Sequence, residues 1–259
     1  MKPLEMYKMK DKTDSFTIKK DRLFDLPMRL LMVGKTGSAK TTKLGNLLLR
    51  PEPFYRNDFD PTNIFIFSGS LKGDMKLREI INQLEIPESN TFEKYDDDIG
   101  NAIYDMIVDN FNNAIANKER PNHTLFVFDD LGFSNMQNQT HKKNDILNRI
   151  LCNGRKYLIS TITLNQRITQ VSRNAREQVS GAILHKCSNK DLEMIEGDFN
   201  YMKNKKDFRD LFLKNTEGQF DFLVINFSNG SHIYQDKNFA NICTCPKNME
   251  SKCGGKRQD

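Results

Sequence analysis

The chain has 259 residues, which allows one large domain or two small ones, and 37% of them are hydrophobic, enough for a buried core. Its net charge of +5 permits a polyanionic partner without requiring one. No run of 18 apolar residues occurs and the first residues lack the apolar block of a signal peptide, so we expect an intracellular protein without a membrane span. Five scattered cysteines argue against a disulfide framework.

In chain order, the pattern first predicts an N-terminal arm without a hydrophobic period, residues 1–26. Further on, short apolar runs that end at polar or glycine residues are typical of buried strands, and apolar residues three and four apart are typical of helices. Buried strands are predicted at 28–33, 64–67, 124–128, 158–164 and 182–184. Helices are predicted at 43–50, 77–84, 99–115 and 146–151.

This alternation of strands and helices predicts the fold class. Repeated βαβ units build an α/β fold with a mostly parallel central sheet flanked by helices. Near the C-terminus, apolar residues at 220–227 and 232–234 flank an Asn-Gly turn, which predicts a C-terminal β-hairpin. We therefore expect one core domain at 27–235 and a polar, flexible tail at 236–259.

The tail carries three of the five cysteines. Cys243, Cys245 and Cys253, with His232 upstream, could in principle form a four-ligand zinc site. The tight Cys-x-Cys spacing and the polar composition instead favour a disordered tail with free thiols.

The most informative segment directly follows the first predicted strand and consists of Gly34-Lys35-Thr36-Gly37-Ser38-Ala39-Lys40-Thr41-Thr42. A strand, a glycine loop and a helix start form the setting in which backbone N–H groups enclose the phosphates of a nucleotide. The segment matches G-x-x-x-x-G-K-[ST] except at Ala39, where the motif has Gly. We expect Lys40 to reach the β- and γ-phosphates of ATP and Thr41 to ligate Mg²⁺.

Ala39 leaves two interpretations of this loop open. The motif's glycine relieves a strained backbone angle, and an alanine at positive φ costs roughly 1–2 kcal/mol. Contacts to the nucleotide offset this strain in one interpretation, and the nucleotide site is weakened or lost in the other. The nine residues alone are also compatible with a turn that binds no ligand.

Polar side chains follow two later strands. Asp129 and Asp130 directly follow the strand predicted at 124–128. Hydrolysis of a magnesium nucleotide needs one carboxylate there to hold the metal and another to activate water. We expect Asp129 to hold Mg²⁺ and Asp130 to orient and deprotonate the water, with helix-capping aspartates as the alternative. Gln166 follows the next strand and is expected to hydrogen-bond the γ-phosphate or the lytic water.

Arginines flank this last strand. Arg155 precedes it, and Arg167, Arg173 and Arg176 follow it. A guanidinium from a neighbouring subunit often stabilises the charge that develops on a γ-phosphate. One of the four is a candidate for this role, and for each the alternative is a salt bridge or a solvated side chain.

Taken together, residues 27 to about 235 resemble the FtsK–HerA group of P-loop ATPases, and within it the poxvirus A32-like genome-packaging ATPases of large DNA viruses and virophages. The segments that carry the resemblance are LLMVGKTGSAKTT, NIFIFSG, LFVFDDLG and NGRKYLISTITLNQRITQVSRNAREQVSGAILHKCSNKDLEMI. Two departures are Ala39 in the loop and Asn165, which stands where the family has Thr before Gln.

The resemblance implies a RecA-like (ASCE) ATPase core that assembles into a ring, a hexamer, and uses ATP and Mg²⁺ to pump double-stranded DNA into a preformed capsid. Partners at the capsid or portal vertex, and a place in the virion and the host's viral factory, are implied with it. By the same match Arg155 is the finger that acts in trans, and Arg176 is a second candidate.

Other functions remain open at this point. One is a nucleotide-binding scaffold or assembly protein with a weakened loop, another is a different DNA-translocating P-loop ATPase, and a nucleotide kinase is disfavoured because no Arg-rich lid is found. For a DNA-translocating ring, basic loops at 69–76 and 134–143 are candidates for the pore. Their lysines are Lys72, Lys76, Lys142 and Lys143.

Overall fold

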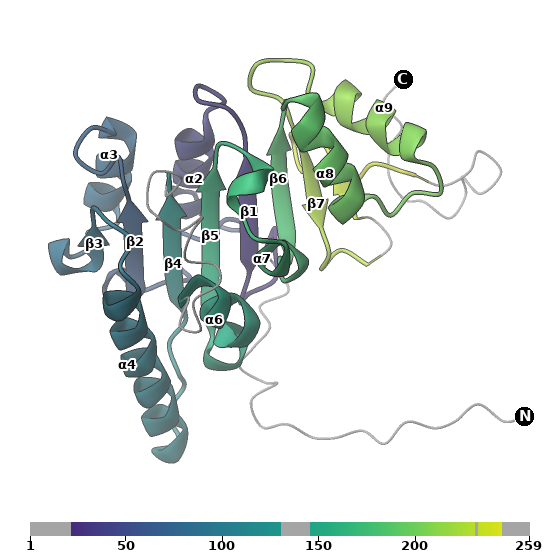
Figure 1. Ribbon diagram of the computed structural model, residues 1–259. Coiled ribbons are helices and arrows are strands. Elements are labelled where there is room, and N and C mark those ends of the chain that lie inside the picture. The colour runs from purple at the N-terminus through teal and green to yellow at the C-terminus, as the bar shows by residue number, and fades with distance from the viewer. Residues whose placement is uncertain (1–21, 131–145, 231–232, 245–259) are drawn as a thin grey trace, which may run out of the picture.

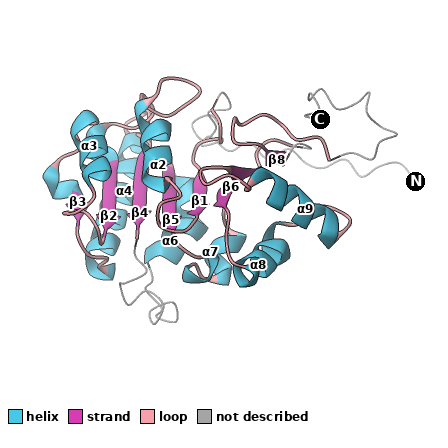
Figure 2. Ribbon diagram, turned by 90° about the horizontal axis from the view of Figure 1, so that it is seen from above, coloured by secondary structure: helices cyan, strands magenta, loops and turns pink. Residues whose placement is uncertain are grey.

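Figure 1 shows the computed structural model, which describes residues 22–130, 146–230 and 233–244. The described chain forms three layers, with helices on both faces of a central sheet (Figure 2). Within these ranges the sheet has eight strands in the order β3-β2-β4-β5-β1-β6-β7-β8. The predicted α/β class with a mostly parallel sheet is confirmed.

The strands are β1 (Arg29–Val33), β2 (Ile64–Ser68), β3 (Thr91–Phe92), β4 (Thr124–Asp129), β5 (Ile159–Asn165), β6 (Gly181–His185), β7 (Phe222–Asn226) and β8 (Tyr234–Gln235). The α-helices are α2 (Lys40–Leu49), α3 (Met75–Gln83), α4 (Asp97–Ala116), α6 (Ile146–Asn153), α7 (Arg173–Glu177), α8 (Asn189–Phe199) and α9 (Lys205–Asn215). Short 3-10 turns are η1 (Pro61–Asn63), η2 (Glu88–Asn90), η4 (Gly154–Tyr157) and η5 (Ile168–Gln170).

The directions in which the strands pair determine which loops meet at one edge of the sheet. Strands β1 to β6 pair in parallel, so their carboxyl ends lie along one edge of the sheet. Strand β7 runs antiparallel to β6, with Phe222 opposite His185, and therefore begins at that same edge. Strand β8 pairs antiparallel with β7, which confirms the predicted C-terminal hairpin. Residues that follow β1, β4, β5 and β6, or precede β7, thus lie on one side of the molecule.

Side chains alternate between the two faces of the sheet. Leu30 and Met32 of β1 join one apolar cluster, to which α2 and α3 contribute, while Leu31 and Val33 join a second cluster with residues of α4, α6, α8 and α9. Both faces are covered, which explains why the parallel strands appear in the sequence as continuous apolar runs rather than as alternating ones.

Several boundaries differ from the predicted ones for local reasons. Helix α2 begins at Lys40 rather than 43, because the glycine loop leads straight into its first turn. Strand β5 begins at 159, since Leu158 has φ 57°, outside the β region. The two-residue strand β3 was not predicted, because an apolar run so short carries no periodic signal.

The described ends of the chain pack onto this core. Phe24 and Leu26, within the predicted arm at 1–26, are buried. Phe239, within the predicted tail at 236–259, makes edge contacts with the rings of Phe24, Phe54 and Phe222. None of the helices in the described ranges is long and apolar enough to cross a bilayer.

Candidate functional site

The loop from Gly34 to Thr42 joins β1 to α2 and is tied to the neighbouring strand. The N–H of Gly34 donates to the carbonyl of Asn165, at the end of β5, at 3.1 Å. A Cβ at Gly34 would lie 2.5 Å from the Ser38 hydroxyl and 2.8 Å from a ring carbon of His185, so only glycine fits there. Gly37 has φ 82°, which favours glycine as well.

Ala39 adopts the conformation that the motif's glycine would adopt. Its φ is 64° and its ψ is 33°, in the left-handed region, and it forms the N-cap of α2 without a side-chain hydrogen bond. The positive φ expected at this position is confirmed, and an alanine pays for it with roughly 1–2 kcal/mol of strain. The N-terminus of α2, where backbone N–H groups and the helix dipole favour anions, follows directly.

Lys40 extends over the loop. Its amine donates to the carbonyls of Gly34 at 2.5 Å and Lys35 at 3.3 Å. Burial lowers the pKa of Lys40, while the charges of Asp129 and Asp130 act in the opposite direction. The amine is thus held at the mouth of the loop, where a phosphate oxygen would offer a stronger, charged acceptor.

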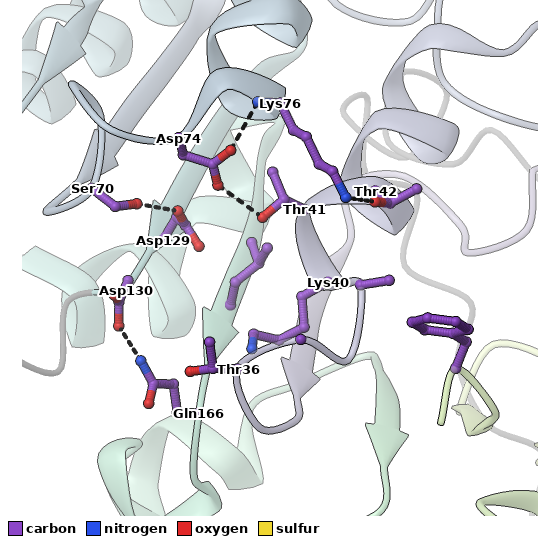
Figure 3. Close-up of a pocket in the computed structure, with 14 residues that line it drawn as sticks. Thr36, Lys40, Thr41, Thr42, Ser70, Asp74, Lys76, Asp129, Asp130 and Gln166 are labelled. Carbon is purple, nitrogen blue, oxygen red and sulfur yellow. Dashed lines mark hydrogen bonds between the residues drawn. The ribbon is translucent and has the colours of Figure 1, made fainter. Parts of the chain in front are cut away.

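Oxygen donors from three segments meet beside Lys40 (Figure 3). The Thr41 hydroxyl donates to Asp74 at 3.1 Å, and the Ser68 hydroxyl donates to Asp129 at 3.0 Å. Burial raises the pKa of Asp129; the hydrogen bond from Ser68 opposes this, and the charges of Asp130 and Asp74 add to the rise. Hydroxyl and carboxylate oxygens are ligands that Mg²⁺ prefers, and a divalent cation would neutralise this excess of negative charge, so the donor set fits Mg²⁺.

Asp130 and Gln166 face each other across the ends of β4 and β5. The Gln166 side-chain amide donates to Asp130 Oδ1 at 3.0 Å. Asp130 has φ 48°, and its N–H donates to the carbonyl of Leu164 at 3.3 Å. Gln170 holds Gln166 in place, because the side-chain oxygen of Gln170 accepts from the N–H of Gln166 at 2.8 Å. A carboxylate held by a fixed amide can position a water molecule.

Most of these groups line one cavity of about 320 Å³, a size that suits a small-molecule ligand. Its described lining residues are Thr36, Gly37, Ala39, Lys40, Thr41, Thr42, Ser70, Asp74, Lys76, Asp129, Asp130, Leu164, Gln166 and Phe220. The structure therefore brings together the loop, both strand-end aspartates and Gln166. Five lining residues were not singled out for this site from the sequence: Ser70, Asp74, Lys76, Leu164 and Phe220.

None of the four candidate arginines lines this cavity. Arg155 is exposed in η4, before β5. Burial, and after it the charge of Arg155, lowers the pKa of Arg29 at the start of β1. Arg176 is only 8% exposed, donates to Asp198 and to the carbonyl of Val171, both at 2.6 Å, and holds α7 in place. Exposed Arg173 pairs with Glu177 one turn along α7. Arg167 is exposed at the start of η5.

Two expectations fall partly outside the described residues. Of the candidate pore lysines, Lys142 and Lys143 lie outside them, Lys72 pairs with Glu93 at 2.9 Å, and Lys76 lines the cavity described above. Of the candidate zinc ligands, only Cys243 is described. Within the described ranges, no group of three or more His, Cys, Asp or Glu residues is placed to hold a metal.

The strand order, the loop at the end of β1 and the carboxylates at the end of β4 define a RecA-like P-loop NTPase fold. The model of the Poxvirus A32 protein family matches residues 15–238, and the chain belongs to that family. This confirms the resemblance found from the motifs.

Solved structures share the fold. The genome-packaging NTPase B204 of Sulfolobus turreted icosahedral virus 2, in complex with AMP, has a TM-score of 0.55 at 12% identity, over 83% of this chain and 98% of that one. B204, the DNA-packaging ATPase of Sulfolobus turreted icosahedral virus, has a TM-score of 0.52 at 13% identity, over 84% of this chain and 99% of that one. No curated protein matches the chain.

Proposed function

We propose that this protein is an ATP-hydrolysing motor that translocates double-stranded viral DNA into a preformed capsid. The observation that carries the proposal is the single cavity in which the loop, the hydroxyl and carboxylate donors, and the Asp130–Gln166 pair meet. Membership of the Poxvirus A32 family and a fold shared with genome-packaging NTPases support it.

The geometry suggests how these residues act on Mg²⁺-ATP. The Lys40 amine replaces its hydrogen bonds to the loop carbonyls with hydrogen bonds to β- and γ-phosphate oxygens. The N-terminus of α2 adds its partial positive charge. Thr41 and Asp129 would hold Mg²⁺, which would supply positive charge to neutralise the negative charge of the phosphates. Asp130, oriented by Gln166, accepts a proton from the attacking water.

A ring would complete the site with an arginine. Arg155 precedes β5 and Gln166 follows it, and the seven residues of β5 span roughly 20 Å, so Arg155 lies at the opposite edge of the sheet from its own cavity. Because its side chain is exposed, we assign the trans-acting finger to Arg155 in a hexameric ring. Arg176, a second candidate from the sequence, is committed to Asp198 within its own chain.

The proposed DNA contact is electrostatic and independent of base sequence. A ring of copies would repeat a net charge of +5, and basic loops around the pore would track phosphates. The capsid or portal vertex is the proposed partner, and the virion and the viral factory in the host cytoplasm are the proposed locations.

A nucleotide-binding scaffold with a weakened loop is the second candidate, and Ala39 is the observation that favours it. Ala39 nevertheless has φ 64° in the folded loop, so an alanine can adopt the conformation that the motif requires. This favours the motor over the scaffold. A different DNA-translocating P-loop ATPase would share the same site.

The translocation step is tested by displacement of a fluorescent third strand from a long DNA duplex. The full chain with Mg²⁺-ATP is expected to release the strand, and Lys40→Ala, which removes the phosphate-binding amine, is expected not to. ATP hydrolysis without strand release, on DNA with and without free ends, would contradict the translocase function.

A further inference from the structure

The cavity has one aromatic lining residue among those that the structure describes, Phe220. Phe220 is 56% exposed, whereas Phe222, two residues further on, is 7% exposed. A large apolar side chain left in water beside a polar cavity suggests a ligand with an apolar face.

Phe220 is held on a rigid turn. It is the third residue of a turn closed by a hydrogen bond from the Asp221 N–H to the Gly218 carbonyl at 3.1 Å. Asp221 in turn pairs with Lys237 at 2.9 Å, and its carbonyl accepts from His185 Nδ1 at 3.1 Å. The ring is therefore presented to the cavity by a fixed backbone, so a flat ligand can stack on it at little cost in ordering.

The sheet topology determines which end of the cavity Phe220 occupies. Strand β7 begins opposite His185, the last residue of β6, so the turn before β7 reaches the edge where the parallel strands end. In the sheet, β5 and β4 lie on one side of β1, and β6 and β7 lie on the other. Phe220 and the aspartates at the end of β4 therefore approach the P-loop from opposite sides.

The proposed site fixes the orientation of a nucleotide bound in this cavity. The proposed function places the γ-phosphate at Asp130 and Gln166, beyond β4 and β5, so the nucleoside extends toward β6 and β7. We propose that Phe220 is the platform on which the nucleobase stacks. This inference rests on the proposed nucleotide site and adds to it the residue that binds the base. Stacking accepts any base, because every base has a π-face.

The test compares ATP with inorganic tripolyphosphate, which has phosphates but no base. In binding titrations with Mg²⁺, Phe220→Ala is expected to weaken ATP binding by about tenfold or more and to leave tripolyphosphate binding within about twofold of wild type. The matched control is Tyr201→Ala, which removes a ring that is 61% exposed outside the cavity and is expected to change neither affinity.

A spectroscopic arm uses the absence of tryptophan from the sequence. Phe220→Trp introduces a single tryptophan that keeps the π-face and can be excited separately from the seven tyrosines, so ATP is expected to quench its emission and tripolyphosphate is not. Equal effects of Phe220→Ala on both ligands, or none on ATP, would overturn the inference while leaving the nucleotide site intact. Failure of the wild-type chain to bind either ligand would overturn the proposed site, and the inference with it.

Discussion

The Thr41 hydroxyl donates to Asp74 Oδ2 at 3.1 Å, while Asp74 Oδ1 accepts the N–H groups of Lys76 and Leu77 and caps α3. One carboxylate thus joins the first turn of α3 to the residue that we expect to ligate Mg²⁺. Asp74 also adds negative charge near Asp129, whose pKa is raised chiefly by burial. Asp74 is therefore placed to orient the metal ligand and to stabilise α3.

The first prediction separates these two tasks of Asp74. Asp74→Ala removes a cap and is expected to lower the free energy of unfolding by about 1 kcal/mol, whereas Asp74→Asn, which still caps, costs less than half of that. Both substitutions remove the charge, so both are expected to raise several-fold the Mg²⁺ concentration at which ATP binding is half-maximal. Chemical denaturation and Mg²⁺ titrations measure the two effects.

Asp96 offers the matched control. It caps α4 through the N–H groups of Asp98 and Ile99, outside the cavity. Asp96→Ala is expected to cost about the same stability and to leave the Mg²⁺ dependence unchanged. If Asp96→Ala and Asp74→Ala shift the Mg²⁺ dependence equally, Asp74 has no specific role toward the metal.

The second prediction concerns the strained loop. Ala39→Gly removes roughly 1–2 kcal/mol of strain at φ 64° but adds about 0.5–1 kcal/mol of unfolded-state entropy, so the free energy of unfolding is expected to rise by no more than about 1.5 kcal/mol. Because the loop already holds this conformation, ATP affinity is expected to stay within about threefold of wild type. Calorimetric titration measures it, and a large gain in affinity would instead support the weakened-site scaffold.

The third prediction compares two lysines of one segment. The Lys76 amine donates to the Thr42 hydroxyl at 2.9 Å on the wall of the cavity, whereas Lys72 pairs with Glu93 on the surface. Lys76→Ala is expected to weaken ATP binding about three- to tenfold through loss of a cation near the phosphates, and Lys72→Ala is expected to leave it unchanged. If Lys76→Ala spares ATP affinity and lowers only stimulation by DNA, Lys76 belongs to the pore, as first expected from the sequence.

The fourth prediction is a pH dependence of stability. Burial beside Lys43 lowers the pKa of His185 to about 3, while the unfolded chain titrates near 6.5. Between these values the unfolded state binds more protons, so stability is expected to fall as the pH drops below 6.5, with His185 contributing about 2 kcal/mol of loss by pH 5.

His185→Asn tests this assignment because an asparagine amide can still donate to the carbonyl of Asp221 without titrating. Denaturation curves at pH 7.5 and pH 5 are expected to show a drop in stability that is about 2 kcal/mol smaller for the variant. An identical drop in both proteins would assign the acid sensitivity to other groups.

Much of the site could be predicted from the sequence because its signals are local. The loop lies between an apolar run and a helix start, and the residues after parallel strands meet at one edge, so Lys40, Asp129 and Gln166 could be placed together. The sheet was readable for the same reason, since each buried strand is a continuous apolar run.

The remaining residues depend on packing that the sequence does not display. Asp74 has the pattern of an ordinary helix cap, and only the approach of α3 to α2 shows its contact with Thr41. Phe220 fits an apolar strand at 220–227, but a turn takes it out of β7 and into the cavity. Arg155 and Arg176 look alike in sequence, and only the structure buries Arg176 against Asp198.

The central claim is that this cavity hydrolyses ATP for work on DNA. The most direct measurement is steady-state hydrolysis of Mg²⁺-ATP by the full chain, with and without long double-stranded DNA, beside Lys40→Ala and Asp129→Ala. We expect turnover in the wild type that rises with DNA, and none in either variant. No turnover by the wild type in either condition, or turnover that both variants retain, would contradict the account.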